Sequence, residues 1–250
     1  MNKTSEDRLG MFIMLILFGY MTYKVAIGLI ATVVTDHRDP LWELIVISRL
    51  SNLIFLSLIV WFTATRLPAR GSVHGFLPRF VAVAGTFVMM AVVILPTVEI
   101  GATQRVVSTL LTVAGTILSI ICIFRLGRSF AIAPAARSLV TSGPYSIVRH
   151  PLYAAELIAV TGGVLSVGSV AAFMLGIVWL MLQIMRARFE EEVLTGTFPE
   201  YRDYARAVPM MVPELKARYL LALRSSTDAA QRDPEPAGLP AGPESVKAIA

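Results

Sequence analysis

The sequence predicts an all-α integral membrane protein with about six transmembrane helices, of which the last two form a tight hairpin before a cytoplasmic C-terminal helical segment. Of the 250 residues, 56% are hydrophobic and only 16% are charged, whereas about 25% are charged in ordinary soluble domains. The mean hydropathy is +0.69. Because these apolar residues gather in long runs, the composition excludes most soluble folds and favours a chain solvated by lipid.

Six apolar stretches account for the predicted helices. They are Leu9–Val34, Leu44–Phe62, Phe80–Pro96, Val106–Phe124, Leu152–Val167 and Val170–Met185. The first four are about long enough to cross a hydrocarbon core of about 30 Å as helices.

The last two stretches are shorter, with sixteen residues each, and are joined by Gly168-Ser169 without an intervening charge. This pattern predicts a helical hairpin that enters the membrane and returns, and it argues against one long helix over 152–185. We expect Gly162, Gly163 and Gly168 to let the two helices of the hairpin approach closely.

The basic residues predict the orientation in the membrane. The N-terminus and the loops at 63–79 and 125–151 carry nine Lys and Arg residues, against two in the alternate loops. The positive-inside rule therefore places both termini in the cytoplasm. We expect a multi-pass protein of the cell inner membrane.

The remaining bulk properties narrow the function classes. Cys122 is the only cysteine, so neither an intrachain disulfide nor a cysteine-based metal site is expected, and a buried apolar role is the natural interpretation. The net charge of +5 is not accompanied by a nucleic-acid motif, so no nucleic-acid partner is expected.

Three charged residues fall inside the apolar stretches. Lys24 and Arg49 are interpreted as snorkelling or internally paired side chains, because a charge in lipid is costly. Glu156 lies one turn into the fifth stretch, close to a dense polar motif, and is a candidate catalytic residue.

The polar motif runs over residues 139–153. Gly143-Pro144 predicts a turn, and Pro151 suits the first turn of a helix. Arg149 and His150 therefore stand at the membrane surface just before a helix N-terminus, where free N–H groups can face an anionic ligand. This motif is either the polar rim of a cytoplasmic pocket or a basic interfacial anchor with an aromatic belt.

A second polar cluster follows the hairpin at Arg186–Glu192. If the sixth helix continues into water, Arg186 and Glu190 are four residues apart and share a face. They are either a surface ion pair or a cation and a carboxylate delivered to the same pocket as His150, since a hairpin returns to the side that it entered.

Together these motifs resemble the isoprenylcysteine carboxyl methyltransferase family, which is related to the membrane phospholipid methyltransferases. The resemblance runs from Leu126 to Pro213. Its specific parts are Leu-Val-Thr-Ser-Gly-Pro-Tyr at 139–145, Arg-His-Pro-x-Tyr at 149–153, Arg-x-x-x-Glu-Glu-x-x-Leu at 186–194 and the closing Tyr201-x-x-Tyr204 with Val208-Pro209.

The resemblance implies S-adenosylmethionine as the cofactor, held in a cytoplasmic cavity, and a lipophilic or small-molecule methyl acceptor. Arg186 would then face the acceptor. The cofactor-binding positions implied by the motifs are Ser138, Leu139, Val140, Tyr145, His150, Leu152, Tyr153 and Glu190. No resident metal is expected.

The implied organisation has three parts. Residues 1–124 hold four transmembrane helices, residues 125–224 form the cofactor-binding catalytic region with the hairpin at 152–185, and residues 225–250 form a disordered tail. A helix at the membrane interface is expected from Pro213 to Arg224.

Three positions depart from the family pattern: Ala155 replaces a glycine, Phe198-Pro199 replaces a Phe-Gly pair, and Met210 replaces a basic residue. The acceptor identity is therefore open. A carboxylate acceptor would need no general base, whereas a phospholipid amine or a thiol would need His150 or Glu156 to remove a proton. A nicotinamide-dependent membrane reductase and a non-enzymatic membrane component are the alternatives, and the oligomeric state is open.

Overall fold

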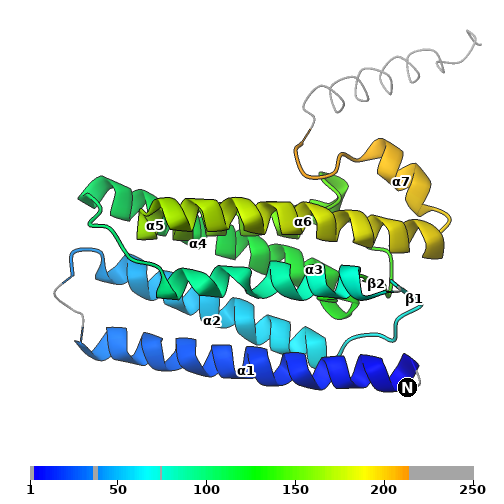
Figure 1. Cartoon of the computed structure of the whole chain (residues 1–250), viewed down its shortest axis with the longest axis horizontal. Coiled ribbons are helices and arrows are strands. Elements are labelled where there is room, and N and C mark those ends of the chain that lie inside the picture. Colours follow the sequence, from blue (N-terminus) through cyan, green and yellow to red (C-terminus); the bar gives the residue numbers. More distant parts are fainter. Residues whose placement is uncertain (1–2, 36–38, 74, 214–250) are drawn as a thin grey trace, which may run out of the picture. The chain divides into compact units, whose positions relative to one another are not determined.

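The computed structural model describes residues 3–35, 39–73 and 75–213 (Figure 1). The expected interfacial helix, except for Pro213, and the expected tail at 225–250 lie outside the described residues.

The described chain is almost entirely helical, which confirms the all-α prediction (Figure 1). The α-helices are α1 Lys3–Thr35, α2 Trp42–Ala64, α3 Phe76–Phe87, α4 Ala102–Leu126, α5 Pro151–Val167, α6 Val170–Thr197 and α7 Tyr201–Ala207. Short 3-10 helices are η1 Val88–Ile94, η2 Gly127–Ser129 and η3 Gly143–Ser146. Two-residue strands β1 Gly71–Ser72 and β2 Ala135–Ala136 pair antiparallel.

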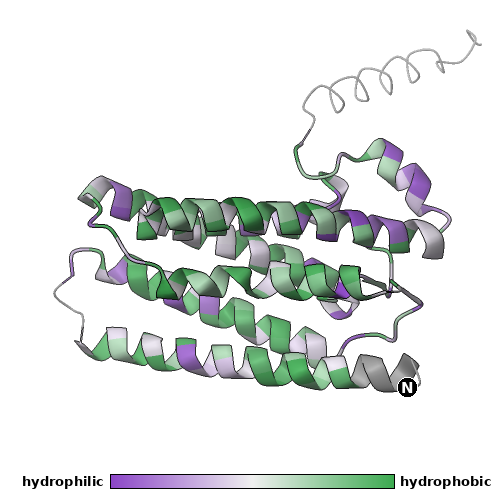
Figure 2. Cartoon of the chain, in the orientation of Figure 1, coloured by the Kyte–Doolittle hydropathy of each residue, from purple (hydrophilic) through white to green (hydrophobic). Residues whose placement is uncertain are grey.

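Four of these helices are long and apolar enough to cross a membrane, namely α1, α2, α4 and α6. Figure 2 shows that hydrophobic residues cover most of their length, whereas hydrophilic residues gather on α7 and the adjoining end of α6. The chain is therefore a multi-pass membrane protein. The core beside α2 and α4 includes Cys122, which is 4% exposed, as expected for a small apolar side chain.

The third predicted span differs from the expectation. Instead of one helix over Phe80–Pro96, α3 holds 12 residues and continues as the 3-10 helix η1. A 3-10 helix rises about 2.0 Å per residue, against 1.5 Å in an α-helix. Residues 88–94 therefore extend further along the helix axis than the same number of residues would in an α-helix. The α-helical part, α3, is too short to be counted with the four long helices.

The hairpin is confirmed, but Gly162 and Gly163 do not bring its two helices together. Gly168 turns the chain between α5 and α6 with a φ of +69°, a conformation that suits glycine. Gly162, in contrast, faces α4: an added Cβ would lie 2.5 Å from the carbonyl oxygen of Ser108. An added Cβ at Gly163 would meet nothing within 4 Å. The close helix pair is thus α4 with α5, and not α5 with α6.

Gly115 of α4 makes the same contact from the other side. A Cβ there would lie 2.3 Å from the backbone nitrogen of Ala159 and 2.8 Å from the carbonyl oxygen of Ala155. Small residues at a membrane helix interface let backbones approach in this way. Gly115 therefore provides the close approach beside Ala155, where the family pattern has a glycine on α5.

The structure also shows where the two basic side chains inside the long apolar helices lie. Arg49 Nη1 donates to the carbonyl oxygen of Gly28 on α1 at 2.5 Å, so the guanidinium is bound to backbone within the bundle. Lys24 is exposed on α1, which fits a side chain that snorkels.

The loops predicted to be cytoplasmic lie together at one end of the bundle. β1 belongs to the loop after α2 and β2 to the loop after α4, and Gly71 pairs with Ala136. Leu67 N also donates to the carbonyl oxygen of Arg128 at 2.9 Å. In Figure 1 this end also carries the C-terminal end of α6 and helix α7. The side of the membrane on which this end lies remains a prediction.

Candidate active site

The motif at 139–153 folds locally as its residues dictate. Gly143 takes a φ of +64° and opens η3, with Pro144 in its first turn. Pro151 is the first residue of α5, and His150 precedes it as the N-cap residue, with a φ of −121° and a ψ of 60°. The predicted turn and helix start are both correct, and they place His150 5% exposed at the N-terminus of α5.

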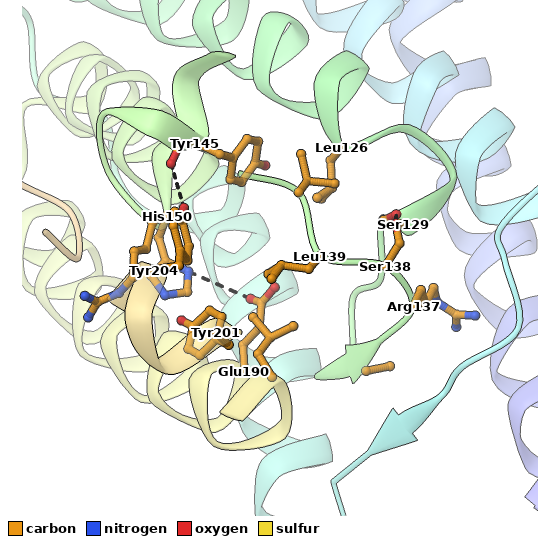
Figure 3. A pocket seen from close by; sticks show the side chains of 14 residues that line it. Leu126, Ser129, Arg137, Ser138, Leu139, Tyr145, His150, Glu190, Tyr201 and Tyr204 are labelled. Carbon is orange, nitrogen blue, oxygen red and sulfur yellow. Dashed lines mark hydrogen bonds and ion pairs between the residues drawn. The ribbon is translucent and has the colours of Figure 1, made fainter. Parts of the chain in front are cut away.

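A pocket of about 450 Å³, partly open to solvent, lies between this motif, the end of α6 and α7 (Figure 3). Six of the positions predicted to bind the cofactor line it, namely Ser138, Leu139, Val140, Tyr145, His150 and Glu190.

A second pocket adjoins the first and shares Tyr145, His150 and Glu190 with it. It is also lined by Leu152, Tyr153 and Arg186. All eight predicted cofactor positions, and the predicted acceptor residue, therefore line one or other of these two adjoining pockets. The hairpin brings them together because α6 extends past Met185 to Thr197 and returns Arg186 and Glu190 to the level of His150.

Glu190 is joined to α5 by a hydrogen bond. The Tyr153 hydroxyl donates to Glu190 Oε2 at 2.8 Å, and His150 Nδ1 lies 4.0 Å from the same oxygen. The His150 and Tyr153 rings stack with centroids 5.4 Å apart and planes within 3°. Figure 3 shows His150 and Glu190 facing each other across the pocket wall.

Arg186 is buried, so it does not form the surface ion pair with Glu190 that was one of the two alternatives. It is 5% exposed, its guanidinium carbon lies 5.1 Å from the centre of the Tyr153 ring, and Nη1 lies 3.5 Å from Thr86 Oγ1. Its Nε has no hydrogen-bond partner among the described residues. A buried guanidinium with an unused donor is suited to an anionic ligand.

Glu156 lies outside both pocket linings. Gln183 Nε2 donates to Glu156 Oε2 at 2.8 Å, so the carboxylate faces α6 one turn deeper than Tyr153. The structure therefore does not bring this predicted catalytic residue to the pocket wall.

Arg149 ties the segment after α6 to the pocket. Its Nε donates to Glu191 Oε1 at 2.7 Å, and its Nη1 donates to the carbonyl oxygens of Ala205 and Val208 at 2.5 and 2.7 Å. The backbone N–H groups of Arg149 and His150 donate to the carbonyls of Pro209 and Met210. Met210 contributes only its backbone carbonyl to this contact. The contact therefore does not depend on which side chain stands at position 210.

Tyr201 and Tyr204 of α7 complete the first pocket. The Tyr204 hydroxyl donates to the carbonyl oxygen of Tyr145 at 2.6 Å (Figure 3). Burial, with Glu191 adding to it and Arg149 opposing it, raises the pKa of Tyr204 to about 12. The hydroxyl therefore keeps its proton at neutral pH and remains a donor.

Residues 103–200 match the family model of phospholipid methyltransferases. This confirms the family resemblance over that segment, which contains every predicted cofactor position.

Two curated proteins are also similar. One is a nickel-cobalt-cadmium resistance protein, NccN, of Alcaligenes xylosoxydans xylosoxydans, and the other a cobalt-zinc-cadmium resistance protein, CzcN, of Cupriavidus metallidurans. Each is 37% identical, over 78 and 79 residues respectively, which are 31% of this chain. The match spans 37% of each relative's length. Within the described ranges, no three His, Cys, Asp or Glu side chains are grouped to hold a metal ion.

Among the residues of the site that sequence reasoning left out, four make polar or ring contacts there, namely Arg149, Glu191, Tyr201 and Tyr204. Arg149 and Glu191 are charged neighbours of the predicted His150 and Glu190, and the two tyrosines form a Tyr-x-x-Tyr pair. Those signals mark the region, but the partners of these side chains are up to 59 residues away along the chain.

The two tyrosines of α7 should respond oppositely to removal of the hydroxyl. Tyr201 is 2% exposed, and its hydroxyl has no hydrogen-bond partner in the described chain. We expect Tyr201→Phe to leave the free energy of unfolding unchanged or slightly raised, because an unsatisfied buried hydroxyl is costly. Tyr204→Phe should lower it by about 1 kcal/mol, since a made hydrogen bond is lost. Thermal unfolding in detergent measures both, and a larger loss for Tyr201→Phe would contradict the assignment.

Proposed function

We propose that this chain is a membrane-embedded methyltransferase that uses S-adenosylmethionine and methylates the carboxylate of a lipophilic acceptor. The observation that carries the proposal is the convergence of His150, Tyr153, Arg186 and Glu190 on adjoining pockets. All four belong to the segment that matches the phospholipid methyltransferase family model.

The pocket chemistry fits this cofactor. When bound, S-adenosylmethionine supplies an electrophilic methyl group on a positively charged sulfonium. Glu190 offers a carboxylate, and the Tyr145 ring offers a π-face that attracts a cation. Leu139 and Val140 supply apolar contacts, and the buried Tyr201 hydroxyl supplies an unused polar atom in the wall of the same pocket.

The acceptor end of the proposal depends on Arg186. Its buried guanidinium, with an unpartnered Nε in the described structure, would hold and orient a carboxylate. A carboxylate is already ionised at neutral pH, so no side chain has to remove a proton. The protein would contribute by positioning the reactants and excluding water, and positioning alone can supply several kcal/mol.

A lipophilic acceptor suits the position of the second pocket. Apolar side chains of Leu126, Phe130 and Leu152 line it beside Arg186. An apolar chain could therefore lie along this wall while its polar end reaches the guanidinium. We propose that the pocket opens on the cytoplasmic side, as the positive-inside rule indicates, in the inner membrane.

Binding of S-adenosylhomocysteine by the detergent-purified protein tests the cofactor. We expect saturable binding by calorimetry, weakened at least about tenfold by Glu190→Gln, since a charged hydrogen-bond partner is removed. Glu192→Gln is the matched control, because Glu192 is an exposed carboxylate two residues further along α6. Binding of NADPH instead would favour the reductase alternative, and binding of neither ligand would contradict the proposal.

A further inference from the structure

His150 stands between two carboxylates of the same helix, and they play different parts. Its Nε2 lies 3.1 Å from Glu191 Oε1, within hydrogen-bond distance. Its Nδ1 faces Glu190 Oε2 at 4.0 Å, beyond that distance. The ring is held flat against Tyr153 and is 5% exposed. The orientation of the imidazole is therefore set on its Nε2 side.

Glu191 can act only as an acceptor in this arrangement. The oxygen that meets His150 also accepts from Arg149 Nε at 2.7 Å, and a carboxylate beside a guanidinium is ionised. An ionised carboxylate has no proton to donate. The hydrogen bond to His150 therefore requires the proton to be on Nε2.

We propose that Glu191 is a positioning residue that orients the His150 ring so that, in the neutral form of the imidazole, the proton is on Nε2 and the lone pair on Nδ1. Nδ1 then lies beside the Glu190 carboxylate on the pocket wall, and the pocket presents two neighbouring hydrogen-bond acceptors to a ligand. This pair suits a ligand that donates hydrogen bonds, such as one with an ammonium group or ribose hydroxyls. Identifying that ligand as the cofactor rests on the proposed function, whereas the ring state does not.

The arrangement follows a general pattern of site construction. A histidine has two distinct nitrogens, and the hydrogen bond that one makes decides which one carries the proton. Arg149 contributes twice, since it keeps Glu191 ionised and binds the carbonyls of Ala205 and Val208. The Arg149 side chain that holds the segment after α6 thus also helps to determine which nitrogen of His150 can accept a hydrogen bond.

Nitrogen NMR of the imidazole tests the ring state directly. The chain has three histidines, so a parent variant with His37→Gln and His74→Gln retains His150 alone. With labelled histidine at about pH 8.5, where an ordinary imidazole is neutral, we expect a protonated Nε2 and an unprotonated Nδ1. A protonated Nδ1 in this parent would overturn the proposal without any change at Glu191.

Two substitutions at Glu191 test whether its acceptor oxygen, and not merely the volume of its side chain, positions the His150 ring. Glu191→Gln retains an oxygen that can accept from both donors, so the Nε2–H form should persist. Glu191→Leu removes the acceptor, so the ring should populate both tautomers. S-adenosylhomocysteine affinity should fall about tenfold in Glu191→Leu and less than about threefold in Glu191→Gln, as expected for one misplaced hydrogen bond. Glu192→Leu should change neither the NMR signals nor the affinity.

The outcomes distinguish this inference from the proposed function. An unchanged tautomer in a folded Glu191→Leu variant would overturn the positioning role. If the parent carries the Nε2 proton but binds no S-adenosylhomocysteine, the proposed function fails while the assignment of the ring state holds.

Discussion

Gly115→Ala should destabilise the protein strongly, by about 3 kcal/mol, because the added methyl group overlaps the backbone of α5. A Cβ at this position would lie 2.3 Å from the Ala159 nitrogen, and a helix backbone cannot move aside as a flexible side chain can. The change should separate α4 from α5 and displace the helix that begins beside His150. Thermal or denaturant unfolding in detergent measures the loss.

Gly163→Ala is the matched control for this prediction. It makes the same chemical change within a helix, but its methyl group would meet nothing within 4 Å. Because alanine has the higher helix propensity, we expect a neutral or slightly stabilising effect of up to about 1 kcal/mol. Equal effects at the two positions would show that the α4–α5 contact is not as close as described.

Arg149→Met should release the segment 201–210 from the pocket. Methionine retains much of the apolar stem but loses the donors to Ala205, Val208 and Glu191. We expect a loss of about 3 kcal/mol, since a largely buried carboxylate and two carbonyls lose their charged partner. Hydrogen exchange should rise at the amides of residues 201–210, and S-adenosylhomocysteine binding should weaken with it.

Arg206→Met provides the comparison. Arg206 pairs with Asp203 at 3.3 Å, and both side chains are at least 80% exposed. Such surface pairs contribute little, so hydrogen exchange over 201–210 should barely change. If Arg149→Met left those amides as protected as Arg206→Met does, Arg149 would not be what holds this segment.

The helices could be predicted where a single physical requirement dominates. Long apolar runs, basic loops and the Gly168-Ser169 junction each indicate their structure locally, and α1, α2, α4 and the α5–α6 hairpin follow. The change from α3 to η1 could not be predicted, because the apolar run over Phe80–Pro96 has no feature that distinguishes the two helix types. The role of Gly162 could not be predicted either, because the partner of a glycine face depends on how helices assemble.

The site divides in the same way. His150, Tyr153, Arg186 and Glu190 could be placed together because a hairpin returns to its starting side. The charge and position of Glu156 predict a catalytic role, but the helix turns its carboxylate toward Gln183. Arg149 and Glu191 were visible as charges, yet their roles depend on carbonyls and rings that only the folded chain brings near. Charge marks the region of a site, and packing decides which groups face it.

Transfer of labelled methyl groups tests the central claim most directly. The purified protein is incubated with methyl-labelled S-adenosylmethionine and membranes of its own host, and the label is counted in lipid, protein and small-molecule fractions before and after treatment with base. We expect label in a lipophilic fraction that base releases as methanol, as from a carboxyl ester. Arg186→Gln should reduce it at least about tenfold, since a charged contact to the acceptor is lost, and Glu192→Gln should not. Base-stable label would contradict a carboxylate acceptor, and no label in any fraction would contradict the methyltransferase itself.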